Sequence, residues 1–284
     1  MLGLPSGGAL HVAGPHGAPP ILFLHGVGGA AWSWRLQADA LATTHRLFVW
    51  EARGHGSAAR VRDAGLSDYY ADAKEALAAL TQETGRPAYV VGHSMGGLLA
   101  IALACDAATA VKGLFLIDPV YATGTEYGHF SPGIGRAALW LCNPLLGSFA
   151  RNGRSSRALA RWMFERSFED RARMEAAWQH QRLQIPVEYP RMLRESFGRP
   201  TGFELRDFAR EIVQPTFLLE GTTGKTKARF PELSATLEQR LGTGFTHETI
   251  DGGHYLQADK PDQVNERLRR FVRDEACLRA AEPA

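Results

Sequence analysis

A serine flanked by small residues stands at one junction of the sequence, between an apolar run and an Ala/Leu-rich stretch. The segment reads YVVGHSMGGLLA from 89 to 100 and contains the pattern Gly92-x-Ser94-x-Gly96. Such glycines allow a sharp strand-to-helix turn that exposes the serine hydroxyl, as in a nucleophile elbow. Because serine is a weak nucleophile at neutral pH, it requires an adjacent base that a third group orients. The segment therefore predicts nucleophilic catalysis at Ser94.

A histidine near the end of the chain is the candidate base for this serine. His254 stands in the segment DGGHYLQADKPDQV, directly after the strand-like run FTHETI. Gly252 and Gly253 allow this loop to fold back toward the edge of a sheet. Chemistry in open α/β sheets gathers at the carboxyl edge, so the loop can bring the imidazole to Ser94.

The glycine-rich segment HGVGG, residues 25–29, follows the first long apolar run. Acyl transfer needs backbone N–H groups aimed at the oxyanion that develops on the carbonyl oxygen. In an elbow enzyme one donor is the residue after the serine, and the other lies in the loop after this strand. We therefore predict that the N–H groups of Met95 and Val27 bind the oxyanion.

Strand and helix patterns alternate between these segments, which predicts a parallel sheet with right-handed crossovers. The predicted strands are 21–25, 46–51, 88–92, 113–118, 215–221 and 245–250, and the predicted helices are 32–42, 67–83, 95–105, 231–241 and 261–274. Residues 121–208 contain helix signals, including a capping pattern of Ser167 and Asp170, but no convincing strand. We expect an α/β core of residues 1–120 and 209–284, interrupted by a helical cap of residues 121–208.

These segments together resemble the α/β-hydrolase superfamily, in its capped esterase/lipase-like branch. The matching pieces are HGVGG, ARGHG, GHSMGG, LFLIDPV and GGHYLQADKPDQV, in the family's order. The resemblance implies the α/β-hydrolase fold, a mostly parallel sheet flanked by helices, with a helical cap inserted after the sixth core strand. It also implies a serine hydrolase that cleaves a carboxylic ester, lactone or thioester through an acyl-enzyme, with neither a metal nor an organic cofactor. Ser94 would be the nucleophile, His254 the general base, and Val27 and Met95 the oxyanion donors.

The acid that orients His254 departs from the family pattern. The family's usual aspartate lies in a GxxD turn, which here reads GTTGK with Gly224 in place of the aspartate. Four carboxylates at predicted strand ends or in adjoining loops are candidates instead: Asp118, Glu220, Asp251 and Glu51.

Asp118 is the preferred acid because it ends the run GLFLID, which should lie beside the Ser94 strand on the side of the His254 loop. Pro119 follows it and predicts an extended backbone there. Glu220 is the second candidate, although its place within an apolar run predicts a side chain directed off the sheet face.

Other classes of protein share parts of this pattern. Gly26-x-Gly28-x-x-Ala31 follows a strand and resembles a dinucleotide-binding fingerprint, with Glu51 ending the next strand. That interpretation explains neither GHSMGG nor GGH. A non-catalytic hydrolase-fold binding protein would account for the absent GxxD acid, and a cofactor-free perhydrolase or C–C hydrolase would use the same triad.

Large apolar residues in the cap region and after the 25–29 segment indicate the kind of ligand. Ligand clefts are mostly apolar and favour domain boundaries. We expect a small-molecule ester-type substrate with an apolar, bulky acyl or alcohol group, in contact with Trp32, Tyr121, Trp140 and Trp162.

Composition argues against several classes of partner. The 284 residues carry 32 Lys and Arg against 30 Asp and Glu, which is no charge excess for nucleic acid or a membrane surface. The three cysteines form no CxxC pair or Cys/His cluster. No apolar run approaches the roughly 18 residues of a membrane span, and the N-terminus lacks the pattern of a secretory signal. We therefore expect a cytoplasmic monomer or homodimer.

Overall fold

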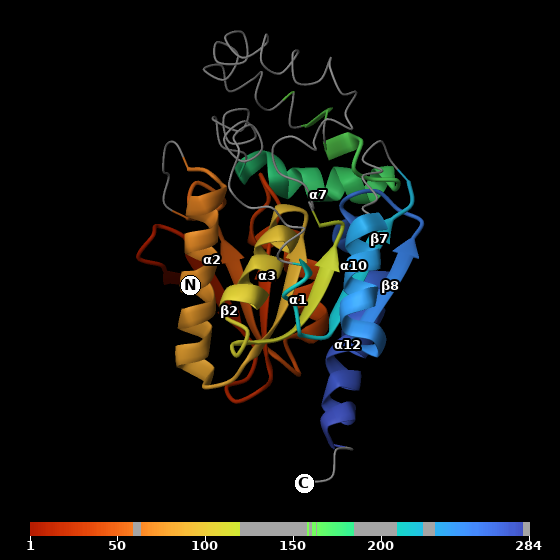
Figure 1. The fold of residues 1–284 in the computed structure, drawn as a ribbon. Helices are drawn as coiled ribbons and strands as arrows, with labels where there is room; N and C mark the ends of the chain where they lie inside the picture. The colour runs from red at the N-terminus through yellow and green to blue at the C-terminus, as the bar shows by residue number, and fades with distance from the viewer. Residues whose placement is uncertain are drawn as a thin grey trace.

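The computed structural model describes residues 1–58, 64–119, 158, 161–162, 164–184, 209–223 and 231–280. Within these ranges the strands form one eight-stranded sheet (Figure 1). In chain order they are β1 (Leu2–Gly3), β2 (Ala9–Ala13), β3 (Pro20–Leu24), β4 (Arg46–Glu51), β5 (Ala88–His93), β6 (Val111–Ile117), β7 (Thr216–Gly221) and β8 (Phe245–Ile250). Their order across the sheet is β1-β2-β4-β3-β5-β6-β7-β8. β1 and β2 pair antiparallel at one edge, and the pairings from β4 to β8 are parallel.

Helices cover both faces of this sheet (Figure 1). α2 (Leu66–Thr84), α3 (Met95–Asp106) and α10 (Pro231–Leu241) pack on one face. The short helix η1 (Ala31–Trp34), α1 (Arg35–Leu41) and α12 (Pro261–Ala280) pack on the other. α7 (Arg171–Gln184) lies across the carboxyl ends of the strands and contacts α11 (Leu256–Asp259). A short turn, η3 (Gly242–Gly244), leads into β8.

The alternation of side chains along the parallel strands builds two apolar cores. In β3, Leu22 and Leu24 join the core under α2, α3 and α10, whereas Ile21 and Phe23 join the core under α1 and α12. All four are fully buried. Each such side chain contributes about 1.5–3 kcal/mol through burial, so both layers of helices hold the central strands rigidly.

The predicted parallel α/β architecture is confirmed, with three local differences. β1 and β2 were not anticipated, because they are short, lie between glycines and prolines, and are stabilised by pairing with β4 rather than by their own pattern. α2 begins at Leu66, one residue before the predicted start, after Gly65, whose N–H donates to the carboxylate of Asp68, 2.9 Å away. α12 continues to Ala280, beyond the predicted end at Asp274.

The described part of the predicted cap contains α7, which begins later than its capping pattern suggested. The helix starts at Arg171, not at Ser167. The carboxylate of Asp170 accepts the N–H groups of Ala172 and Arg173, at 2.8 and 3.0 Å. A carboxylate that takes two orphan donors of the first turn is an effective N-cap, which explains the shift.

Candidate active site

The turn between β5 and α3 carries Ser94 in a conformation that non-glycine residues rarely adopt. Its φ is 53° and its ψ is −117°. A backbone of this kind costs on the order of 1–3 kcal/mol, so surrounding contacts must hold it. One of them is the hydrogen bond from the Ser94 N–H to the carbonyl oxygen of Ile117, 3.1 Å away. The serine thereby lies at the carboxyl edge of the sheet, with 9% of its surface exposed.

Gly92 and Gly96 are needed because the elbow brings backbone against backbone. A Cβ at Gly96 would overlap the carbonyl oxygen of Leu24, and one at Gly92 would overlap the carbonyl oxygen of Gly96. The start of α3 therefore packs directly on the end of β3. A Cβ at Gly26 would lie 3.0 Å from the Cβ of Ser94, so the loop after β3 lies against the serine.

His254 and Asp118 meet at this edge, on the loops after β8 and β6. Nδ1 of His254 lies 3.3 Å from Oδ2 of Asp118. Oδ1 of Asp118 accepts the N–H of Gly221, 2.9 Å away, and the Asp118 N–H donates to the carbonyl oxygen of Leu219, also at 2.9 Å. The imidazole thus has a carboxylate partner that β7 holds in place.

The extended backbone predicted at Asp118 is wrong. Its φ is 39°, in the left-handed region. Aspartate visits this region more readily than most residues, and the two hydrogen bonds to β7 outweigh the preference that Pro119 imposes.

The alternative acid, Glu220, lies against a different histidine. Its Oε2 is 2.6 Å from Nε2 of His247, and Nδ1 of His247 lies 3.1 Å from the hydroxyl of Ser234. Asp251 accepts the hydroxyl of Thr222 at 2.9 Å. Neither carboxylate contacts His254 in the described structure.

Glu51, the remaining candidate, lies on the far side of β5 from the His254 loop. Its carboxylate contacts the imidazole of His11 and accepts hydrogen bonds from Ser57 and from the backbone N–H of Ala31. Burial opposes its ionisation, but these partners outweigh burial and lower the pKa of Glu51 to about 2. Glu51 is therefore a structural anion, and its bond to the Ala31 N–H holds the end of the loop that follows β3.

His93, which precedes Ser94, holds the loop that carries His254. Its ring lies 4.7 Å from the ring of His254, centroid to centroid, and its Nε2 donates to the carbonyl oxygen of His254 at 2.9 Å. Burial, together with repulsion from a charged His254, keeps the pKa of His93 well below its ordinary value. A neutral His93 therefore links the nucleophile turn to the histidine loop.

Two buried histidines fix the 25–29 loop to the 52–57 turn. Nδ1 of His25 donates to the carbonyl oxygen of Gly26 at 2.7 Å, and its Nε2 accepts the N–H of Ala52 at 3.1 Å. Nε2 of His55 accepts the N–H of Gly28 at 3.1 Å. Burial lowers the pKa of both rings, that of His55 to about 3 with the nearby His25 as a further cause. Each ring can accept a backbone N–H because it is neutral.

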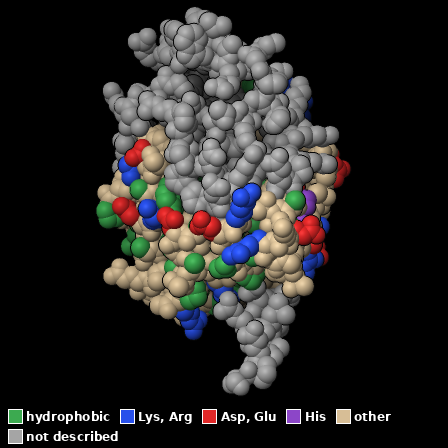
Figure 2. Space-filling model, in the orientation of Figure 1, with side chains coloured by type: hydrophobic (Ala, Val, Ile, Leu, Met, Phe, Trp, Pro, Cys, Tyr) green, Lys and Arg blue, Asp and Glu red, His purple; other side chains and the backbone are tan. Residues whose placement is uncertain are grey.

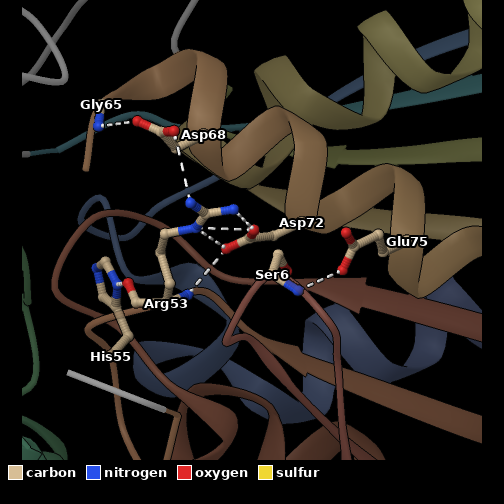
Figure 3. A network of polar contacts seen from close by, with 7 residues as sticks. All are labelled: Ser6, Arg53, His55, Gly65, Asp68, Asp72 and Glu75. Carbon is tan, nitrogen blue, oxygen red and sulfur yellow. Dashed lines mark hydrogen bonds and ion pairs between the residues drawn. The ribbon is translucent and has the colours of Figure 1, made fainter. Parts of the chain in front are cut away.

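The 52–57 turn is itself anchored to α2 (Figure 3). The guanidinium of Arg53 pairs with the fully buried carboxylate of Asp72, with Nε 2.9 Å from Oδ1, and the Arg53 N–H donates to Oδ2 at 3.0 Å. Asp68 lies 3.5 Å from the same guanidinium. A buried pair with these additional hydrogen bonds is strongly destabilising to break, so the turn is a rigid support for the loop.

One predicted oxyanion donor follows the serine in sequence, and the other follows a glycine that lies against the serine in space. Met95 is the first residue of α3, and Val27 follows Gly26, which lies against Ser94. Across the described residues, neither N–H donates to another backbone or side-chain group. Met95 lies in the first turn of α3, where helix N–H groups are free to bind an anionic oxygen.

The neutral state of His55 predicts acid-labile folding. Its pKa is about 3 in the folded protein, against about 6.5 in an unfolded chain. The unfolded chain therefore binds the proton first as pH falls. The contribution of His55 to the free energy of unfolding, fully present above pH ~6.5, is lost as pH falls toward about 3, by up to ~1.4 kcal/mol per pH unit. His55→Gln should make the free energy of unfolding less dependent on pH between 6 and 4, as measured by urea denaturation. Equal pH dependence in both proteins would contradict this.

An aromatic cluster joins the core to α7 and the residues before it. Tyr255 packs against Trp32, Phe164 and Phe168, with ring centroids 6.3, 5.0 and 5.5 Å apart. Phe164 also contacts Trp178 on α7 at 5.6 Å. Trp32 therefore lies in an apolar wall beside the 25–29 loop, together with Tyr255, which the sequence analysis did not single out.

The other predicted substrate contacts differ in their placement. Trp162 is 53% exposed, and the guanidinium of Arg166 lies 3.9 Å from its ring. This is a surface position, which gives no support to a role in the pocket. Tyr121 and Trp140 lie outside the described residues.

One face of the molecule carries side chains of both charges. Figure 2 shows Lys and Arg side chains interspersed with Asp and Glu over the described part of this face. No group of His, Cys, Asp and Glu among the described residues is arranged to hold a metal ion. Within the same ranges, no helix has the length and apolarity that a membrane span demands.

Comparison with known proteins agrees with this architecture. The model of the alpha/beta hydrolase family matches residues 21–267. A protein of Azorhizobium caulinodans, provisionally named carbamate hydrolase RutD, is 27% identical over 260 residues, which cover 90% of this chain and 92% of that protein. The enol-lactonase from Burkholderia xenovorans LB400 superposes with a TM-score of 0.72 at 21% identity, over 93% of this chain and 96% of that one.

A shorter match involves a larger protein. The dihydrolipoyllysine-residue acetyltransferase component of the acetoin cleaving system of Cupriavidus necator is 39% identical over 105 residues. That match covers 37% of this chain and 27% of the length of that protein. The family match, in contrast, extends from β3 into α12 and includes every element around Ser94 and His254. The chain therefore belongs to the α/β hydrolase family.

Proposed function

We propose that this protein is a serine hydrolase that cleaves a carboxylic ester, a lactone or a thioester through an acyl-enzyme. The Ser94 hydroxyl attacks the carbonyl carbon while Nε2 of His254 takes its proton. The N–H groups of Val27 and Met95 stabilise the oxyanion, and Asp118 orients the imidazole and stabilises its charged form.

The bond to the leaving group then breaks, and His254 returns the proton to the departing alkoxide or thiolate. A water molecule attacks the acyl carbon and gives its proton to His254. The bond to Ser94 breaks, the carboxylic acid leaves, and the serine oxygen regains its proton. Each step uses the same imidazole as proton carrier.

One observation carries this proposal: a strained serine on an elbow shares a sheet edge with a histidine that has its own carboxylate partner. Ser94 has a φ of 53°, and Nδ1 of His254 lies 3.3 Å from Asp118. A serine held in a costly conformation, next to a loop with free N–H donors, is the arrangement that acyl transfer needs.

The aromatic wall supports an apolar, bulky substrate group. Trp32 follows the 25–29 loop and stacks on Tyr255, and Phe164 connects this pair to Trp178 on α7. We propose that residues 121–208 form a helical cap inserted into the core. The expected result is a higher kcat/KM for aromatic or medium-chain esters than for short, charged ones, and the reverse order would contradict the proposed substrate class.

Active-site labelling tests the proposed chemistry directly. A fluorophosphonate probe should phosphonylate Ser94 with release of fluoride, and peptide mass spectrometry should locate the adduct on residues 89–100. Ester turnover should stop in proportion to labelling. A panel that adds lactones, thioesters and β-diketones separates ester hydrolysis from C–C hydrolysis by the same residues. An unlabelled Ser94 would overturn the proposal.

A further inference from the structure

The carboxylate of Asp259 lies beneath the histidine loop and is not part of the proposed chemistry. It ends α11 and is 1% exposed. Its Oδ2 accepts the N–H of Gly253, the residue before His254, at 3.1 Å. Charge-assisted hydrogen bonds of this kind are about twice as strong as neutral ones.

The same carboxylate also binds the segment that leads into α7. Oδ2 accepts the N–H of Glu169 at 3.1 Å, and Oδ1 accepts the N–H of Asp170 at 2.9 Å. One buried anion therefore joins two stretches of chain that are more than eighty residues apart in sequence.

The two stretches also touch directly. The N–H of Tyr255 donates to the carbonyl oxygen of Ser167 at 3.0 Å, and a Cβ at Gly253 would overlap that same oxygen. The glycine thus permits the close approach, and Asp259 supplies the charge that holds it. The neighbouring Lys260 pairs with the side chain of Glu169 at 2.6 Å, so it is a separate link between the same parts.

We propose that Asp259 is a positioning residue for His254, which it aligns by binding the His254 loop to the segment 167–170. This inference rests on the proposed function, because it takes His254 to be the proton carrier. The position of residues 167–170, which precede α7, would then determine how His254 is aligned. A displaced loop would misalign His254 with Ser94, and a misplacement of about 1 Å can cost ~100-fold in rate. Tyr255 and Phe168 of the aromatic wall lie on the same two stretches, so KM is expected to rise together with the fall in kcat.

The test variant is Asp259→Asn, which keeps the shape but places an amide NH₂ group against a backbone N–H. We expect kcat for an ester substrate, and the rate of fluorophosphonate labelling at Ser94, to fall together by about 10- to 100-fold. Two controls should keep wild-type rates. Glu169→Gln removes the adjacent ion pair with Lys260. Val272→Ala lowers the free energy of unfolding from a buried site on α12, the helix after α11.

The outcomes separate this inference from the proposed function. If wild-type Ser94 is not labelled, the proposed function fails. If the wild type is labelled and Asp259→Asn is labelled equally fast, the positioning role fails. It also fails if Asp259→Asn raises KM without lowering kcat. Hydrogen exchange on the wild-type protein gives a second measurement should the variant not fold. The amides of Gly253, Glu169 and Asp170 should show similar protection, since they share one acceptor, and unrelated protection would overturn the inference.

Discussion

Replacing Ser94 with alanine is expected to lower kcat for ester hydrolysis by about 10⁶-fold. The variant loses the covalent pathway, so only the oxyanion donors and substrate binding remain to accelerate hydrolysis, by roughly 10³- to 10⁴-fold over water. The fold should be retained, because the backbone N–H of Ser94 still donates to the carbonyl oxygen of Ile117 in the variant. The measurement is kcat at saturating substrate, with circular dichroism as the check on folding.

Ser234→Ala is the matched control for this prediction. Ser234 also lies beside a histidine that contacts a carboxylate, with 3.1 Å from its hydroxyl to Nδ1 of His247. It lacks the strained elbow and the free N–H donors that surround Ser94. Its removal should therefore leave kcat unchanged. Full activity in Ser94→Ala, or its loss in Ser234→Ala, would refute the assignment of the nucleophile.

Asp118→Asn is expected to lower kcat by about 10⁴-fold, because an amide neither holds the correct tautomer of His254 nor stabilises its charged form. The amide oxygen can still accept the Gly221 N–H that now bonds Oδ1 at 2.9 Å, so the fold should survive. Burst labelling by the fluorophosphonate should slow in parallel with kcat, since both require His254 to take the proton of Ser94.

Glu220→Gln tests the alternative acid in the same assays. Glu220 contacts His247 at 2.6 Å, on the α10 side of the sheet, so its replacement should have a mild effect on kcat. A large loss in Glu220→Gln with little loss in Asp118→Asn would transfer the role of the acid to the strand β7. Comparable losses in both would indicate that neither carboxylate acts alone.

The sequence by itself determined the architecture and the elbow. A buried parallel strand appears in the sequence as a short apolar run, which depends only on residues adjacent along the chain. The bounds of β3 to β8 were therefore predicted within a few residues. The same holds for the turn at Ser94. Positions 92 and 96 require glycine because any Cβ there would overlap a backbone oxygen. The two glycines therefore indicate the sharp turn in the sequence itself. The role of Ser94 as a nucleophile remains a prediction that labelling must test.

Only the tertiary structure decided which groups lie together around this elbow. The sequence made Asp118 the preferred partner of His254, but four carboxylates were candidates, and only the strand order, with β6 between β5 and β7, brings Asp118 within 3.3 Å of the imidazole. The positive φ of Asp118, contrary to the preference set by Pro119, comes from hydrogen bonds to β7. The three N–H donors that converge on Asp259 come from distant segments. Periodicity and residue type report on neighbours along the chain, whereas these contacts arise from long-range packing, which a single sequence does not specify.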